Sequence, residues 1–128
     1  MKKLILAALI SIYSLFAFSQ SVTEHMVTAF KMGSAKELAK NFSTSVDISI
    51  NDNEDTYSKA KAEKVMKDFF NAHQPKSFSI IHQGTSKSGL QYSIGNLETS
   101  SGSFRVSFYL KKTNDSHYIQ QLRIDSDE

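Results

Sequence analysis

Apolar and polar positions alternate most clearly in two neighbouring segments near the end of the chain, Leu90–Thr99 and Ser103–Lys112. In the second segment every other residue is apolar: Phe104, Val106, Phe108 and Leu110. This period of two is typical of a strand with one buried face. Ser100-Ser101-Gly102 lies between the two segments and predicts a hairpin turn. Phe78–His82 and Tyr118–Ile124 alternate in the same way, so the pattern predicts an antiparallel meander of four strands.

The strand Leu90–Thr99 changes phase along its length. Tyr92 and Ile94 share one set of alternate positions, whereas Leu97 belongs to the other set. Gly95-Asn96 lies at the change, where one extra residue would re-aim the side chains and bend the strand. We therefore expect a β-bulge at Gly95-Asn96.

Three helices are predicted before the meander. The longest, Ser58–His73, has apolar residues at the three-and-four spacing of one buried face. These residues are Ala62, Val65, Met66, Phe69 and Phe70. Pro75 ends this helix. Two shorter helices begin at the capping boxes Ser21–Glu24 and Ser34–Glu37, and Gly33 between them suits the left-handed residue that ends a helix. The apolar residues assigned to the second short helix are Leu38, Ala39 and Phe42.

A further strand, Ser45–Ile50, precedes the long helix, and the polar stretch Asn51–Asp55 after it is predicted to be a solvated loop. Asp52 and Glu63 occupy the first and twelfth positions of an EF-hand loop, but Tyr57 stands where that loop requires glycine, so no calcium site is expected. The predicted order is two helices, a strand, a helix and four strands. This order indicates an α+β domain in which N-terminal helices pack on a curved antiparallel sheet.

The beginning of the chain resembles a secretory signal peptide over residues 1–19. Met1-Lys2-Lys3 precedes an apolar run, Leu4–Phe18, and Ala17-Phe18-Ser19 closes it. The run is shorter than the roughly 20 residues of a membrane-spanning helix. We expect cleavage before Gln20, export to the periplasm or the medium, and a single domain over residues 20–128 with no membrane span.

Loss of the leader changes the charge balance. Removing Lys2 and Lys3 reduces the 15 basic side chains to 13, equal to the 13 acidic ones. A neutral chain lacks the basic surface that nucleic acids require, so no nucleic-acid partner is expected. The chain has no cysteine, which excludes disulfides, thiol catalysis and cysteine-ligated zinc. No phosphate-binding glycine loop, hydrolase motif or metal-ligand spacing is present, so the sequence predicts no cofactor and no metal.

Several short motifs occur together in one protein family. They are the helix–Gly33–helix unit, Tyr57–Ala62, Phe69-Phe70, Phe78 with His82-Gln83-Gly84, Tyr92–Gly95, Phe104-Arg105-Val106 and Ile119–Ile124. By these motifs the chain resembles short secreted proteins of Bacteroidetes-type bacteria that form a domain-of-unknown-function family. That family is similar to the nuclear transport factor two-like, or cystatin-like cone, superfamily. The resemblance implies a cone-shaped α+β fold. It carries over no catalytic residues, because the superfamily hosts isomerases, dehydratases and non-catalytic binding domains on one scaffold.

His73, His82 and Tyr92 are the candidate residues for a pocket at the open end of the cone. His82 continues the apolar phase of its strand and could act inside a pocket as a general base near neutral pH. His73 stands on the apolar side of the long helix, and Asp47 is a further candidate acid. The alternative for each histidine is a structural role in which the ring is bonded to a neighbouring group, and we favour that alternative.

Arg105, Tyr109 and Arg123 are candidates for binding at the surface. Arg105 and Tyr109 lie on the polar phase of their strand, and Arg123 falls on the corresponding face of the last strand. Arginines on such a face can bind an anion or a partner. Our hypothesis for Arg105 is that it is solvated or paired within the chain. A homodimer through a sheet face is a further expectation.

These observations favour a secreted, non-catalytic domain that binds a small molecule, a peptide or an envelope partner. The alternative is a small isomerase- or dehydratase-like enzyme that uses His82 or His73 with Tyr92 or Asp47. A structural or oligomerising role through a sheet face is a third hypothesis.

Overall fold

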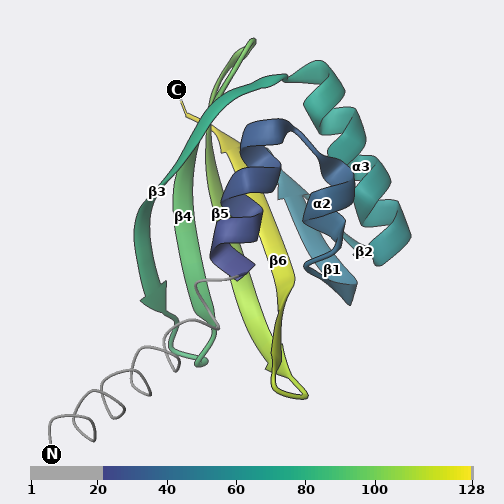
Figure 1. Cartoon of the computed structure of the whole chain (residues 1–128), viewed down its shortest axis with the longest axis vertical. Helices are drawn as coiled ribbons and strands as arrows, with labels where there is room; N and C mark the ends of the chain where they lie inside the picture. Colours follow the sequence, from purple (N-terminus) through teal and green to yellow (C-terminus); the bar gives the residue numbers. More distant parts are fainter. Residues whose placement is uncertain (1–21, 128) are drawn as a thin grey trace, which may run out of the picture.

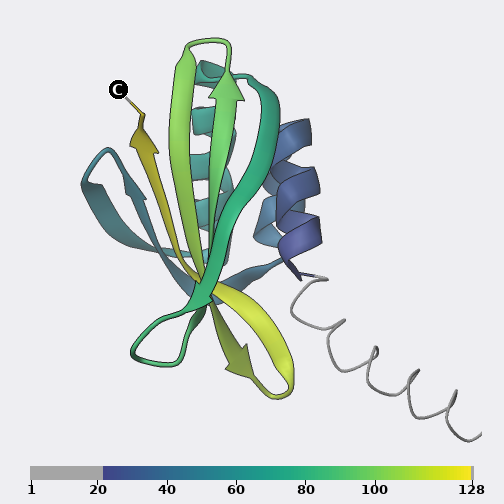
Figure 2. The ribbon, with the colours of Figure 1, turned by 90° about the vertical axis from the view of Figure 1, so that its left-hand side faces the viewer.

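The computed structural model describes residues 22–127, in which the helices lie on one face of a curved six-stranded sheet (Figures 1 and 2). The helices are residues 22–32, α2 (Ala35–Ala39) and α3 (Lys59–Ala72). We call the sheet face beneath the helices the inner face and the opposite one the outer face. This arrangement confirms the α+β expectation. The expected leader, residues 1–19, and its cleavage point before Gln20 lie outside the described residues.

The sheet has a mixed topology. Its strands are β1 (Phe42–Ile50), β2 (Asn53–Ser58), β3 (Pro75–Thr85), β4 (Gln91–Thr99), β5 (Gly102–Thr113) and β6 (Ser116–Ser126). Their order across the sheet is β2-β1-β6-β5-β4-β3. The predicted meander is present as β3 to β6, and its neighbouring strands are antiparallel. The sheet is therefore mostly antiparallel, as predicted, and the exception is β1, which pairs with β6 in parallel.

The stretch Asn51–Asp55 is not the solvated loop that we predicted. The turn consists of Asn51 and Asp52, whose φ angles are 49° and 68°. Positive φ at both central residues is what a type I′ hairpin turn requires. The chain then returns as β2, which pairs with β1 from Ile50 opposite Asn53 to Ser45 opposite Ser58. Nearly all β2 side chains are exposed, so the apolar alternation that marks a strand is missing there.

The helix ends follow the predicted local signals. Gly33 has a φ of 64°, and the N–H of Ser34 donates to the carbonyl of Ala29 at 3.0 Å, which closes the first helix. The Ser34 hydroxyl accepts a bond from the N–H of Glu37 at 3.2 Å. The other predicted capping box includes residue 21, which lies outside the described residues. Phe42 does not belong to the second helix, as we predicted, but begins β1.

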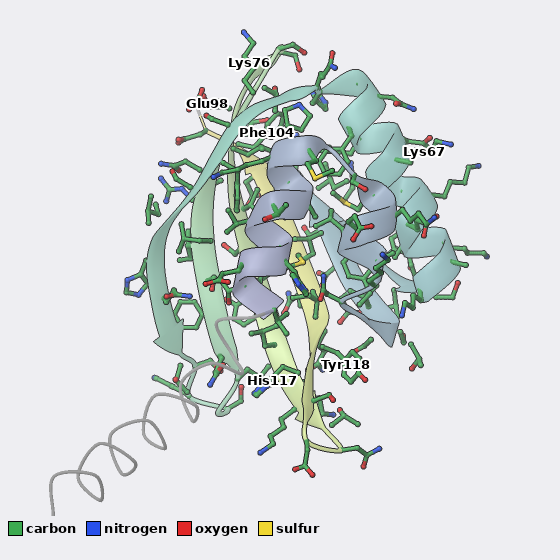
Figure 3. All side chains as sticks on the ribbon, viewed as in Figure 1. Lys67, Lys76, Glu98, Phe104, His117 and Tyr118 are labelled. Atoms are coloured by element: carbon green, nitrogen blue, oxygen red, sulfur yellow. The ribbon has the colours of Figure 1, made fainter. Side chains whose placement is uncertain are left out.

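The core lies between the helices and the inner face. Phe30 stacks on Phe78, with 4.8 Å between ring centroids, and meets Phe70 edge-on at 5.8 Å. Phe69 and Phe70 are 5% and 6% exposed, which confirms the buried face predicted for α3. Figure 3 shows Phe104 between the sheet and the helices, whereas Lys67 points away from the core.

The predicted bulge at Gly95-Asn96 is absent. β4 pairs with β5 without interruption, and its buried residues are Ser93, Gly95, Leu97 and Thr99. The alternation is therefore regular along the whole strand, and Tyr92 and Ile94 lie on the outer face. Gly95 serves close packing instead, because a Cβ at this position would lie 2.5 Å from Cζ of Phe78.

The neighbouring strand β3 has a bulge instead, between Ile80 and His82. Ile80 pairs with Gly95 and His82 pairs with Ile94, so Ile81 is an extra residue in the ladder. The Ile81 side chain is 50% exposed. Because the bulge reverses the alternation, His82 turns to the outer face and Gln83 turns to the inner face. The prediction that His82 continues the apolar phase is therefore wrong.

Candidate functional site

A hollow of about 550 Å³ lies between helix 22–32 and β3, which run beside each other in Figure 2. Its lining residues are Thr23, Glu24, Val27, Thr28, Ile80 and Gln83. Pockets that bind small molecules usually measure about 300–1,000 Å³. The hollow therefore has the size of a small-molecule site.

The two elements present these side chains for separate reasons. Thr23, Val27 and their neighbours line one side of helix 22–32, because residues four apart share a helix face. On β3, the bulge at Ile81 is what places Gln83 on the same face as Ile80. Regular alternation would have put His82 there instead. The bulge thus replaces a titratable ring with a neutral amide at the hollow.

The hollow combines two apolar side chains with four polar ones. Val27 and Ile80 are half-buried and pack against the core. The Gln83 amide donates to the hydroxyl of the buried Ser93 at 3.2 Å, and this bond orients the side chain. Glu24 is exposed, and no ion pair found within residues 22–127 involves it. A ligand can therefore meet apolar carbon, an oriented amide and a carboxylate in one place.

The three candidate pocket residues do not come together. The ring of His82 lies beside Tyr92 on the outer face, with 3.2 Å between Nε2 and the phenol oxygen. His73 ends α3, where its Nδ1 is bonded to the hydroxyl of Ser101 and its ring packs on Phe104. Ser101 lies two residues beyond the end of β4, whereas Tyr92 lies near the beginning of that strand. None of the three lines the hollow.

The candidate surface residues share the outer face. Arg105 donates to Asn96 at 3.2 Å and lies 4.0 Å from the carboxylate of Asp127. Arg105 is therefore paired within the chain, which agrees with our hypothesis. Tyr109 lies next to Tyr92, with 5.7 Å between ring centroids.

Arg123 is held by two carboxylates. Its Nε donates to Asp125 at 2.7 Å, and its Nη2 lies 2.9 Å from Asp52. The hydrogen bond from Arg123 to Asp125 raises the pKa of the guanidinium above its ordinary value. Asp52, the first position of the EF-hand spacing, is thereby engaged by an arginine. Asp47, also on this face, accepts a bond from the Thr56 hydroxyl at 2.5 Å.

Sequence reasoning missed most of the hollow. In the sequence, Val27 is one of several apolar residues of the first helix, and Gln83 stands out only as part of the motif His82-Gln83-Gly84. Glu24 was interpreted as part of a capping box. No residue pattern marks a hollow formed by a helix and a strand more than fifty positions apart in the chain.

Two kinds of feature are absent from the described residues, a membrane-spanning helix and a cluster of metal-binding side chains. None of the helices in residues 22–127 is long and apolar enough to cross a membrane. The same residues contain no group of three or more histidine, aspartate or glutamate side chains placed to hold a metal ion.

Comparisons with known proteins identify the family and the fold. Residues 23–125 match the model of DUF4783, a domain of unknown function. The crystal structure of a DUF4783 family protein from Bacteroides uniformis is 35% identical, with a TM-score of 0.77 over 82% of this chain and 96% of that one. No curated protein matches this chain.

Two more distant crystal structures share the fold. A domain of unknown function with a cystatin-like fold from Nostoc punctiforme is 14% identical, with a TM-score of 0.65 over 84% of this chain and 74% of that one. An NTF-2 like protein of unknown function from Silicibacter pomeroyi is 13% identical, with a TM-score of 0.65 over 91% of this chain and 98% of that one. At such low identity these likenesses concern the fold alone.

Proposed function

The chain belongs to the DUF4783 family, a domain of unknown function with an NTF2-like, cystatin-like fold, and from that premise we propose that it is an exported, non-catalytic small-molecule-binding domain. The ligand occupies the hollow between helix 22–32 and β3. The observation that supports this proposal is the lining of the hollow, in which half-buried Val27 and Ile80 stand beside the oriented amide of Gln83. The two apolar side chains share the lining with Thr23, Glu24 and Thr28, so the hollow can make hydrogen bonds as well as apolar contacts with a ligand.

The lining also favours one kind of ligand. An apolar part packs against Val27 and Ile80, and a hydrogen-bonding group meets the amide of Gln83. Glu24 favours a positively charged or donating group on the ligand, because bonds to a carboxylate are stronger than neutral ones. The His82–Tyr92 pair faces away from the hollow, so the proposal gives it no part in this site.

Export is proposed from the leader pattern over residues 1–19. Sequencing the N-terminus of the mature protein should find Gln20 as its first residue. An intact Met1 on a membrane-bound product would overturn this part of the proposal.

Binding is tested with protein purified from its native host. Native mass spectrometry should find a small molecule that copurifies, and calorimetry then measures its affinity for three variants. Val27→Trp fills the hollow and should weaken binding by about tenfold or more, which corresponds to about 1.4 kcal/mol. Gln83→Ala removes the oriented amide and should also weaken binding.

Met32→Trp is the matched control, because Met32 is on the same helix, 68% exposed and absent from the lining. All three variants should melt as cooperatively as wild type. Absence of a copurifying molecule, or wild-type affinity in Val27→Trp, would refute the proposal.

A further inference from the structure

The outer face carries a line of side chains that the hollow does not use. Strand register places Tyr92 opposite Tyr109, Tyr109 opposite Gln121, and Gln121 beside Asp47. His82 joins the line through its contact with Tyr92. We call His82, Tyr92, Tyr109, Gln121 and Asp47 the outer row. It crosses five neighbouring strands, from β3 to β1.

Three aromatic rings lie side by side in the outer row. The Tyr92 centroid is 5.7 Å from that of Tyr109 and 5.7 Å from that of His82, with interplanar angles of 36° and 46°. Tyr92 also lies over Gly84, where a Cβ would come within 2.7 Å of the phenol oxygen. An aromatic ring that covers a strand glycine has a structural use of its own. Both tyrosines nevertheless remain partly exposed, so part of each ring is open to a ligand.

The arginines beside the outer row are already paired within the chain. Arg123 is bonded to Asp125 and to Asp52, and Arg105 lies near Asp127. A charged ligand would have to compete with these pairs, whereas a neutral ligand would not. The surface left between the pairs consists of aromatic rings, the Gln121 amide and the Asp47 carboxylate, which already accepts a bond from the Thr56 hydroxyl. These side chains can donate or accept hydrogen bonds.

We propose that the outer row binds a neutral oligosaccharide. A sugar ring offers what this surface requires, an apolar C–H face for the tyrosine rings and hydroxyls at its edge. The C–H faces of successive sugars lie on Tyr92 and Tyr109. Their hydroxyls exchange hydrogen bonds with His82, Gln121 and Asp47. This site lies on the opposite sheet face from the hollow and does not depend on its ligand.

Affinity electrophoresis of the full mature chain tests this inference. The probes are three neutral polysaccharides, laminarin, starch and mannan, and one anionic polysaccharide, polygalacturonate. At least one neutral polysaccharide should retard the wild-type protein. Tyr109→Ala should weaken that retardation by about tenfold or more, as expected for loss of an aromatic anchor. Tyr109→Phe keeps the ring and should leave retardation nearly unchanged.

Two further variants keep the result interpretable. Gln121→Ala removes only hydrogen bonds from the outer row and should weaken retardation even if Tyr109→Ala fails to fold. Met32→Ala alters the helical layer and should leave retardation unchanged. Melting curves verify that each compared variant is folded.

Three outcomes would overturn the inference. The first is that none of the neutral polysaccharides retards the protein. The second is retardation by polygalacturonate alone, which would assign the face to an anion. The third is self-association of the wild-type protein in sedimentation experiments, on which neutral polysaccharides have no effect and which Gln121→Ala or Tyr109→Ala abolishes. That result would assign the face to a second copy of this chain.

Discussion

Replacing Gly95 with alanine tests how closely the sheet packs against the helices. The added Cβ would lie 2.5 Å from Cζ and 2.7 Å from Cε1 of Phe78, and 2.9 Å from the carbonyl oxygen of Ser79. Phe78 is 2% exposed and stacks on Phe30 at 4.8 Å. Its ring therefore has no free space into which it can retreat.

Two opposing terms set the size of the effect. Overfilling a packed core costs about 1–3 kcal/mol. Gly95 is not among the residues with positive φ, so alanine fits its backbone and restricts the unfolded chain, which stabilises by about 0.4–1 kcal/mol. We expect Gly95→Ala to lower the free energy of unfolding by about 1–2 kcal/mol. For a domain of this size each kcal/mol lowers the melting temperature by about 4–8 °C.

Thermal and urea denaturation of Gly95→Ala, Phe78→Leu and the double variant measure this loss. The smaller leucine makes room for the new methyl group, so the double variant should lose less stability than the sum of the two, with a coupling of about 0.5–3 kcal/mol. Gly84→Ala is the control, because the group it displaces, Tyr92, is partly exposed on the outer face and can turn toward solvent. Wild-type stability in Gly95→Ala, or strict additivity with Phe78→Leu, would refute the reasoning.

Phe69→Ala and Phe70→Ala should each cost about 3–5 kcal/mol, because both rings are buried on α3, and unchanged urea midpoints would contradict the packing of that helix. Arg105→Ala should cost only about 0–1 kcal/mol, because its side chain is 46% exposed, and a larger loss in the same assay would show that its pairing matters more than a surface ion pair. The hydrogen bond from Lys40 lowers the pKa of Glu37, so Lys40→Ala should raise that pKa toward its ordinary value in an NMR titration. The pKa of Glu37 is lower in the folded than in the unfolded protein. The Glu37–Lys40 pair therefore stabilises the fold above the unfolded carboxyl pKa of about 4.3, and this stabilisation is lost as pH falls through the folded-state pKa. A Glu37 pKa that stays unchanged in Lys40→Ala would exclude the pair as the cause of the lowered pKa.

Local patterns predicted the elements whose signals lie within a few residues. The period of two marked the strands of the meander, and the apolar stripe marked α3. The end of the first helix at Gly33 and the cap at Ser34 were also predictable, because each depends on the backbone within one turn.

β2 was not predicted from the sequence, because the strand lacks an apolar alternation; the evidence for it lies in the turn that precedes it. Its side chains are exposed, so burial imposed no apolar pattern on them. The turn before it is Asn51-Asp52, and the turn between β5 and β6 is Asn114-Asp115, with positive φ at all four residues. Asparagine and aspartate tolerate that conformation, so these two pairs were the available evidence for hairpins.

The position of the bulge decided the candidate sites, and the strand sequence could not supply it. Gly95 suggested a bulge in β4, but its missing side chain accommodates Phe78 from the neighbouring strand. The extra residue is Ile81, and it exchanges His82 for Gln83 at the hollow. A shift of one residue reverses every later side chain, and only the partner strand determines where that shift occurs.

By itself the sequence determined the α+β class, the meander, the long helix and the caps, because periodicity and capping arise from residues close together in the chain. The tertiary structure decided the parallel pairing of β1 with β6, the place of the bulge and the union of helix 22–32 with β3 into a hollow. It also gathered Tyr92, Tyr109 and Arg123 on one outer face. These features depend on contacts between segments far apart in the chain, whose register is set by the packing of both partners together.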